Sequence, residues 1–182
     1  MTSFALRLYV CAATILSLAA TCLAQTPAQS NTPPPVPDHA AYARIFHEIA
    51  VLKGIADEAQ KKGDDRSNLR SIVRKEARLS ESEGAVLERI ALQCEADLAA
   101  LDARAQVIIN KYLERYPYGI VNSSIPMAPP PPELKPMQTE RNNLVLLARD
   151  RLRNELGEDS FAKFDRYVKK DVTETQATSP AR

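Results

Sequence analysis

The sequence is poor in the residues on which disulfides and metal centres depend. Its 182 residues include three cysteines and two histidines. Cys11 and Cys22 lie in an N-terminal segment that is expected to be removed, which would leave Cys94 without an internal disulfide partner. His39 and His47 form no HExxH pair, and the sequence has no CxxC or Asp-rich calcium loop. We therefore expect no metal site, no cofactor and a fold that rests on packing alone.

The signatures of nucleophilic catalysis are also missing. No GxSxG elbow is present. Cys94 falls on the apolar stripe of a predicted helix, a position typical of a small buried side chain; a reactive thiol or an intermolecular disulfide is the alternative interpretation. An acid–base site would need polar groups that converge in a pocket, and the sequence indicates none. We expect no catalytic residues and a protein that is not an enzyme.

Neither sign of charge is in excess, since 24 Lys and Arg face 23 Asp and Glu. Removal of the first 24 residues would take away Arg7 and no acidic residue, and the remaining chain would be formally neutral. A neutral chain lacks the sequence-independent attraction to phosphate on which nucleic-acid binders rely. We expect no nucleic-acid partner.

Residues 1–24 have the pattern of an export signal. A short segment ending at Arg7 carries positive charge, an apolar run follows, and the small side chains of Cys22 and Ala24 suit cleavage before Gln25. The run is shorter than the roughly 20 apolar residues of a membrane-spanning helix, which favours cleavage. We predict Sec export to the periplasm or the medium. A retained anchor or a lipidated Cys22 is the alternative, and only these would bring membrane contact.

The rest of the chain is predicted to be all-α, because glycine is scarce and Ala, Leu, Glu and Arg are plentiful. Residues 25–37 form a Pro-rich spacer that is expected to be disordered, and 38–170 form the helical domain. A Pro-rich loop occupies 117–136 within the domain. Residues 171–182 form a polar tail, which is also predicted to be disordered. The predicted fold is an elongated bundle of four to five helices with one long central helix.

Apolar residues at steps of three and four define the individual helices. Asp38 and Asp159 are the expected N-caps of the first and last helices, and Ser80 with Glu83 forms an S-x-x-E capping box that opens the long one. The helices are predicted at residues 39–62, 66–78, 80–116, 137–156 and 159–170.

The most unusual charge pattern lies on the second predicted helix. Four arginines follow one another at intervals of four residues: Arg66, Arg70, Arg74 and Arg78. Like charges at this spacing repel unless anions lie between them, so an anionic group is expected nearby. Carboxylates of the same chain are one interpretation. The other is a docking face for an unidentified protein or an anionic envelope component, with these four arginines as the candidate partner-binding residues.

Two parts of the chain resemble exported proteins. Residues 79–83, Leu-Ser-Glu-Ser-Glu, are similar to the L-T-x-x-Q motif of small periplasmic chaperones, with Ser for Thr and Glu for Gln. The PPPPEL segment at 129–134 and the F-x-x-F-D-x-Y-V pattern at 161–168 look like uncharacterised exported helical proteins of soil bacteria. With the export signal, these features predict a chaperone-like or adaptor module that binds its partner in the bacterial envelope. A self-associating structural protein is the alternative.

Overall fold

The computed structural model describes residues 35–116 and 128–178, which belong to one unit of the chain, residues 33–182. The predicted signal at 1–24 lies outside the described residues, as do most of the predicted spacer and residues 117–127, the first part of the predicted Pro-rich loop. The described part contains no strand, and the all-α prediction is confirmed. Its elements are α1 (Asp38–Lys61), the 3-10 helix η1 (Ser67–Ser71), α2 (Ile72–Glu76), α3 (Glu81–Leu113), α4 (Leu134–Leu156) and α5 (Glu158–Thr178).

The long helix α3 begins at the predicted capping box. The Ser80 hydroxyl accepts a hydrogen bond from the Glu83 backbone N–H at 3.3 Å, and the Ser80 N–H donates to the Glu83 carboxylate at 2.6 Å. The other carboxylate oxygen of Glu83 accepts a hydrogen bond from the Ser160 hydroxyl of α5. The Glu83 side chain thus caps α3 and connects it to α5. Helix α3 runs for 33 residues, or about 50 Å.

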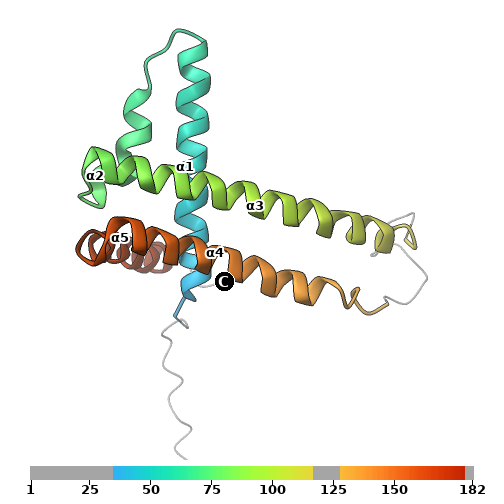
Figure 1. The fold of residues 1–182 in the computed structure, drawn as a ribbon. Helices are drawn as coiled ribbons and strands as arrows, with labels where there is room; N and C mark the ends of the chain where they lie inside the picture. The colour runs from blue at the N-terminus through green and yellow to red at the C-terminus, as the bar shows by residue number, and fades with distance from the viewer. Residues whose placement is uncertain (1–34, 117–127, 179–182) are drawn as a thin grey trace, which may run out of the picture. The chain divides into compact units, whose positions relative to one another are not determined.

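Helices α3 and α4 lie side by side and run in opposite directions (Figure 1). Ion pairs connect the two helices along their length: Arg89 joins Glu155 at one end, and Arg104 joins Glu140 at 2.6 Å toward the other. These pairs are exposed and individually stabilise the fold little, so the buried apolar side chains supply most of the attraction. The two helices contribute to the core Leu87, Ile90, Cys94, Leu98, Val145, Ala148 and Leu152.

Helix α1 crosses this pair and also contacts α5 (Figure 1). Tyr42 of α1 packs against the rings of Phe161 and Phe164 of α5, with centroids 6.3 and 6.0 Å away. The Tyr42 hydroxyl donates a hydrogen bond to Asp165 at 2.7 Å. Because Phe164 and its neighbours are almost wholly buried, this aromatic cluster is the part of the core that holds α5 in place.

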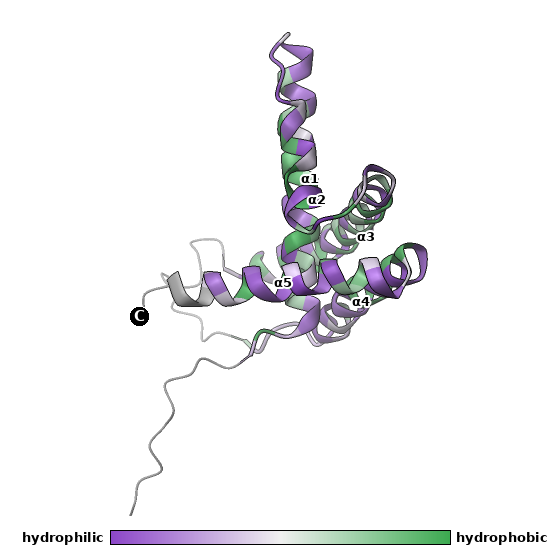
Figure 2. Ribbon diagram, turned by 90° about the vertical axis from the view of Figure 1, so that its left-hand side faces the viewer, coloured by the Kyte–Doolittle hydropathy of each residue, from purple (hydrophilic) through white to green (hydrophobic). Residues whose placement is uncertain are grey.

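The C-terminal half of α1 extends past α3 and α4, and η1 and α2 return along it (Figures 1 and 2). The turn between them depends on Gly63, whose φ of 77° lies in the left-handed region. Arg70 of η1 pairs with Asp57 of α1. The end of α1 is mainly hydrophilic (Figure 2), which is consistent with its small contribution to the core.

Ser80 caps α3 as predicted, but the two aspartates predicted as N-caps, Asp38 and Asp159, do not cap their helices. Pro37 occupies the N-cap of α1, and Asp38 is the first helical residue. The Asp38 carboxylate pairs with Arg149 of α4 at 3.0 Å instead of bending onto its own backbone. Helix α5 begins at Glu158, directly after Gly157, whose carbonyl accepts from the Phe161 N–H at 3.0 Å. Asp159 therefore lies inside the first turn.

The predicted helix at 66–78 is wrong in form, because the segment consists of η1 followed by the five-residue α2. Short polar side chains bond to the nearby backbone: Asp65 accepts from the Ser67 N–H at 3.1 Å, and the Ser71 hydroxyl donates to the Asn68 carbonyl at 2.8 Å. Such local bonds compete with the regular α-helical pattern. The four arginines consequently do not share one continuous helical surface.

Two predicted boundaries are also wrong. Helix α4 begins at Leu134 and not at residue 137, because Pro136 falls in its first turn, where a missing N–H needs no partner. Residues 171–178 of the predicted disordered tail are the last two turns of α5. Arg44 of α1 anchors them, since its guanidinium pairs with Asp171 at 2.7 Å and donates to Thr175 at 2.6 Å.

A candidate cationic cleft between the α2–α3 turn and α5

The turn between α2 and α3 has a strained residue at its centre. Arg78 has φ 56° and is the one non-glycine residue of the described ranges with positive φ. The Leu79 N–H donates to the Arg74 carbonyl at 3.0 Å and the Arg78 N–H to the Lys75 carbonyl at 3.1 Å, the bonds of a Schellman motif. Glycine is the usual residue at this position, because a side chain there costs about 1–2 kcal/mol. The turn nevertheless carries an arginine, and Leu79 beyond it enters the core.

Arg74 extends in another direction, over the start of α3. A Cβ atom placed on Gly84 would lie 2.1 Å from Cδ of Arg74 and 2.7 Å from its Cγ. The aliphatic stem of Arg74 therefore occupies the space that a side chain at position 84 would need. This packing explains why residue 84 is glycine, although glycine in the first turn of a long helix lowers the stability of the helix.

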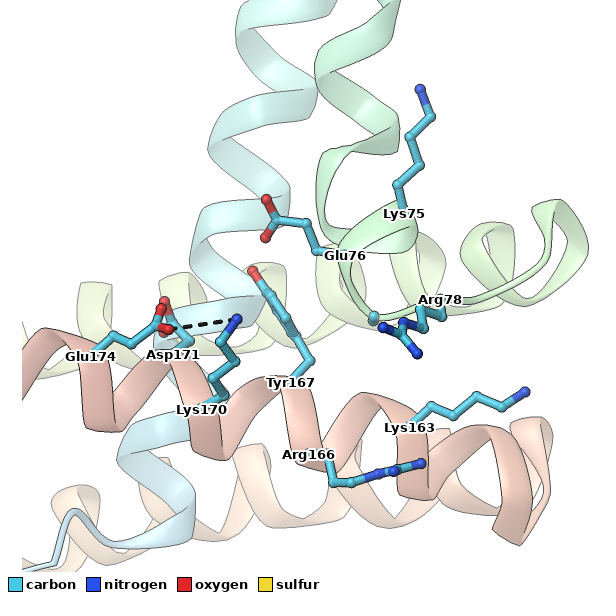
Figure 3. A pocket seen from close by; sticks show the side chains of 10 residues that line it. Lys75, Glu76, Arg78, Lys163, Arg166, Tyr167, Lys170, Asp171 and Glu174 are labelled. Carbon is cyan, nitrogen blue, oxygen red and sulfur yellow. Dashed lines mark ion pairs between the residues drawn. The ribbon is translucent and has the colours of Figure 1, made fainter.

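A hollow of about 700 Å³ lies between this turn and α5. Its volume is within the roughly 300–1,000 Å³ that small-molecule sites occupy. Arg78 faces Arg166 across it, Lys163 extends outward beside them, and Lys75 points away from all three (Figure 3). Helix α5 positions its side chains because Phe161, Phe164 and Val168 anchor its opposite face in the core. We call this hollow, with Arg78, Lys163, Arg166, Tyr167, Lys170 and Asp171 among its lining residues, the cationic cleft.

Three of the cations in the cationic cleft form no ion pair within the described residues. Arg78 and Lys163 form no ion pair, and Arg166 donates from Nε to the carbonyl of Ala162 in its own helix at 3.2 Å. Hydrogen bonds from Ser160 and Ser80 lower the pKa of Glu83 to about 2, and the charge of Lys163 lowers it further. The positive charge of the remaining cations is left uncompensated at this end of the cleft.

Two carboxylates of the same cleft, in contrast, form ion pairs. Asp171 pairs with Arg44 at 2.7 Å, and Glu174 pairs with Lys170 at 3.5 Å. Burial first, and then the surrounding carboxylates, raise the pKa of the Tyr167 phenol. Asp171 and Glu174 lie to one side of Tyr167, and Arg78, Lys163 and Arg166 lie to the other (Figure 3). The cleft is therefore polarised, with unpaired cations at one end and paired carboxylates at the other.

The four arginines that the sequence singled out are not brought together. Arg66 pairs with Asp64 at 3.0 Å, and Arg70 pairs with Asp57 and approaches Gln60 at 3.4 Å. Arg74 lies over Gly84. Arg78 alone of the four enters the cleft. Lys163 and Arg166 were missed: their spacing of three residues on the last predicted helix is a signal, but nothing in the sequence shows that this face meets Arg78.

Cys94 is free and only 3% exposed, so the prediction that it is buried is confirmed. Burial raises the pKa of its thiol to about 11. His47 lies on the surface and contacts Glu95 at 3.0 Å. Residues 35–116 and 128–178 contain no group of three or more side chains arranged to hold a metal ion.

No helix in the described part of the chain has the length and apolar character needed to cross a membrane. Comparison of the chain with protein-family models, with curated proteins and with solved structures gives no match.

Proposed function

We propose that this protein is an exported helical binding or adaptor module of the bacterial envelope, and that its cationic cleft takes up an anionic group of the partner. The observation that carries the proposal is a set of three cations, placed around one hollow by two separate elements, that form no ion pair within the described residues: Arg78, Lys163 and Arg166. The strained backbone position of Arg78 supports it further, because strained residues cluster at functional sites.

The chemistry of the cleft suits recognition of anions. Guanidinium groups donate two parallel hydrogen bonds to oxyanions, and an ammonium group adds a compact point charge. Removal of the predicted signal leaves a chain without net charge, so anion binding would depend on this local arrangement and not on an overall attraction.

Retention on an anionic resin tests the proposal. The variant Arg78→Gln/Lys163→Gln/Arg166→Gln removes three charges from the cleft. The control Lys111→Gln/Arg115→Gln/Arg151→Gln removes three other cations that form no ion pair within the described residues. We expect the cleft variant to elute at lower salt than both the wild type and the control. Equal elution of the two triple variants would refute a specific site, because overall charge would then explain the retention.

Export is tested separately. The predicted signal at 1–24 leads us to place the protein in the periplasm or the medium, with a retained anchor or a lipoprotein as the alternative. Fractionation of cells that express the full chain, combined with N-terminal sequencing of the product, distinguishes these outcomes. A product that begins at Gln25 in the periplasmic fraction supports cleavage, and a full-length product in the cytoplasm contradicts export.

Self-association is the second candidate function, and exposed apolar side chains favour it. Val51 and Ile55 lie one turn apart on α1, and each is 43% exposed. Such a pair on a protruding helix suits contact with a second copy. Light scattering over a range of concentrations decides between the two functions, since a binding module stays at constant mass and a structural protein assembles.

A further inference from the structure

We infer that the group bound in the cationic cleft is a phosphate monoester, with Arg78 and Arg166 holding its oxygens from opposite walls. The inference rests on the proposed function and specifies the chemical class of the anionic ligand. A planar carboxylate is satisfied by one guanidinium fork, because its two oxygens lie in one plane. A phosphate group presents three strong acceptor oxygens around a tetrahedron and carries nearly two negative charges, so it accepts from several cations at once.

The arrangement of the cleft matches that geometry. Arg78 comes from the α2–α3 turn, and Lys163 and Arg166 come from α5 on the facing wall (Figure 3). A single phosphate between the walls would neutralise cations that form no ion pair with the rest of the described structure. The hollow of about 700 Å³ also leaves room for the rest of a small ester beside the phosphate.

The acidic end of the cleft offers no free cation to a long polyanion. A chain of phosphates or a nucleic acid that followed the hollow would pass from Arg166 to Asp171 and Glu174, whose carboxylates already hold Arg44 and Lys170 in ion pairs. A ligand with one terminal phosphate and an uncharged remainder does not need further cations beyond Arg166. The polarity of the cleft therefore favours a phosphate monoester over a polymer of the same charge.

Calorimetric titration of the mature protein with glycerol 3-phosphate tests the inference, with acetate and sulfate as comparison anions. We expect the phosphate monoester to bind and acetate not to bind. Between about pH 5.5 and about pH 7.5 its affinity should rise, because the second pKa of a phosphate monoester is near 6. Sulfate remains a dianion throughout this range, so its titration reports any change in the protein itself.

Single substitutions test whether glycerol 3-phosphate binds in the cleft. Arg78→Gly removes one cation and suits the left-handed backbone of the turn, so its folding is not in question. Arg166→Gln removes the cation of the opposite wall. Each should weaken binding of glycerol 3-phosphate about tenfold or more, the loss expected for one charge-assisted hydrogen bond. Arg151→Gln, an exposed arginine of α4 outside the cleft, should leave the affinity unchanged.

Binding to vesicles distinguishes a lipid headgroup from a soluble phosphate ester as the ligand. Sedimentation with phosphatidic acid in phosphatidylcholine, released by glycerol 3-phosphate, would support a lipid headgroup as the ligand. If the protein binds glycerol 3-phosphate in calorimetry but does not sediment with the vesicles, the result would support a soluble ester as the ligand. Acetate binding as tight as phosphate binding, or unchanged affinity in Arg78→Gly and Arg166→Gln, would overturn the phosphate assignment while anion binding stands. Absence of binding to every anion would overturn the proposed function as well.

Discussion

The turn at Arg78 gives a prediction in which stability and binding change in opposite directions. A non-glycine residue at φ 56° carries a backbone cost of about 1–2 kcal/mol, which Arg78→Gly removes. Glycine also gives the unfolded chain more freedom, which costs about 0.5–1 kcal/mol. Because Arg78 has no ion pair to lose within the described residues, we expect a net stabilisation of up to about 1.5 kcal/mol and a rise in Tm of up to about 6 °C.

The matched control is Arg78→Ala, which removes the same charge and keeps the strain. Urea unfolding of both variants, analysed by linear extrapolation, should show Arg78→Ala about 1 kcal/mol less stable than Arg78→Gly. The affinity for glycerol 3-phosphate should fall equally in the two variants. If Arg78→Gly unfolds at a lower urea concentration than the wild type, or if the two variants are equally stable, strain in this turn is not the reason for the effect.

Three further predictions concern the core and α3. Because the pKa of Glu83 is lowered, its carboxylate contributes fully to stability above about pH 5, and this contribution is lost as the pH falls toward about 2. The variant Glu83→Gln should flatten this part of the acid-unfolding curve. An unchanged curve would contradict the hydrogen bonds from Ser80 and Ser160. Phe164→Ala, at a fully buried position, should destabilise the fold by about 3–5 kcal/mol in urea. The Cys94 thiol should react with a disulfide reagent only as fast as the protein unfolds; rapid labelling of the native protein would show that it is accessible.

The helical architecture could be predicted from local pattern. Apolar residues at steps of three and four gave α1, α3 and α4 within a few residues, and the Ser80–Glu83 capping box gave the start of α3. These signals depend on residues close together in the chain, and their physics is local. Where side chains had tertiary partners the prediction failed: Asp38 pairs with Arg149 and does not cap α1, and Arg44 extends α5 beyond residue 170.

The candidate site was predicted only in part. Spacing placed four arginines on one face, but Arg66 and Arg70 found carboxylates of the same chain, and Arg78 alone lines the cleft. The partners of Arg78 lie about 85–90 residues away in the sequence, on a helix whose direction no local pattern encodes. Nothing in the sequence indicated that position 78 adopts left-handed backbone, since the residue there is not glycine or asparagine.

By itself the sequence determined that the chain is helical and where most of its helices lie, because periodicity and capping act between neighbouring residues. Tertiary structure alone decided which charges remain uncompensated. An arginine is a free cation only if no carboxylate of another helix reaches it, and that depends on how the aromatic cluster of Tyr42, Phe161 and Phe164 sets α5 against α1 and the α2–α3 turn. The cationic cleft follows from that packing.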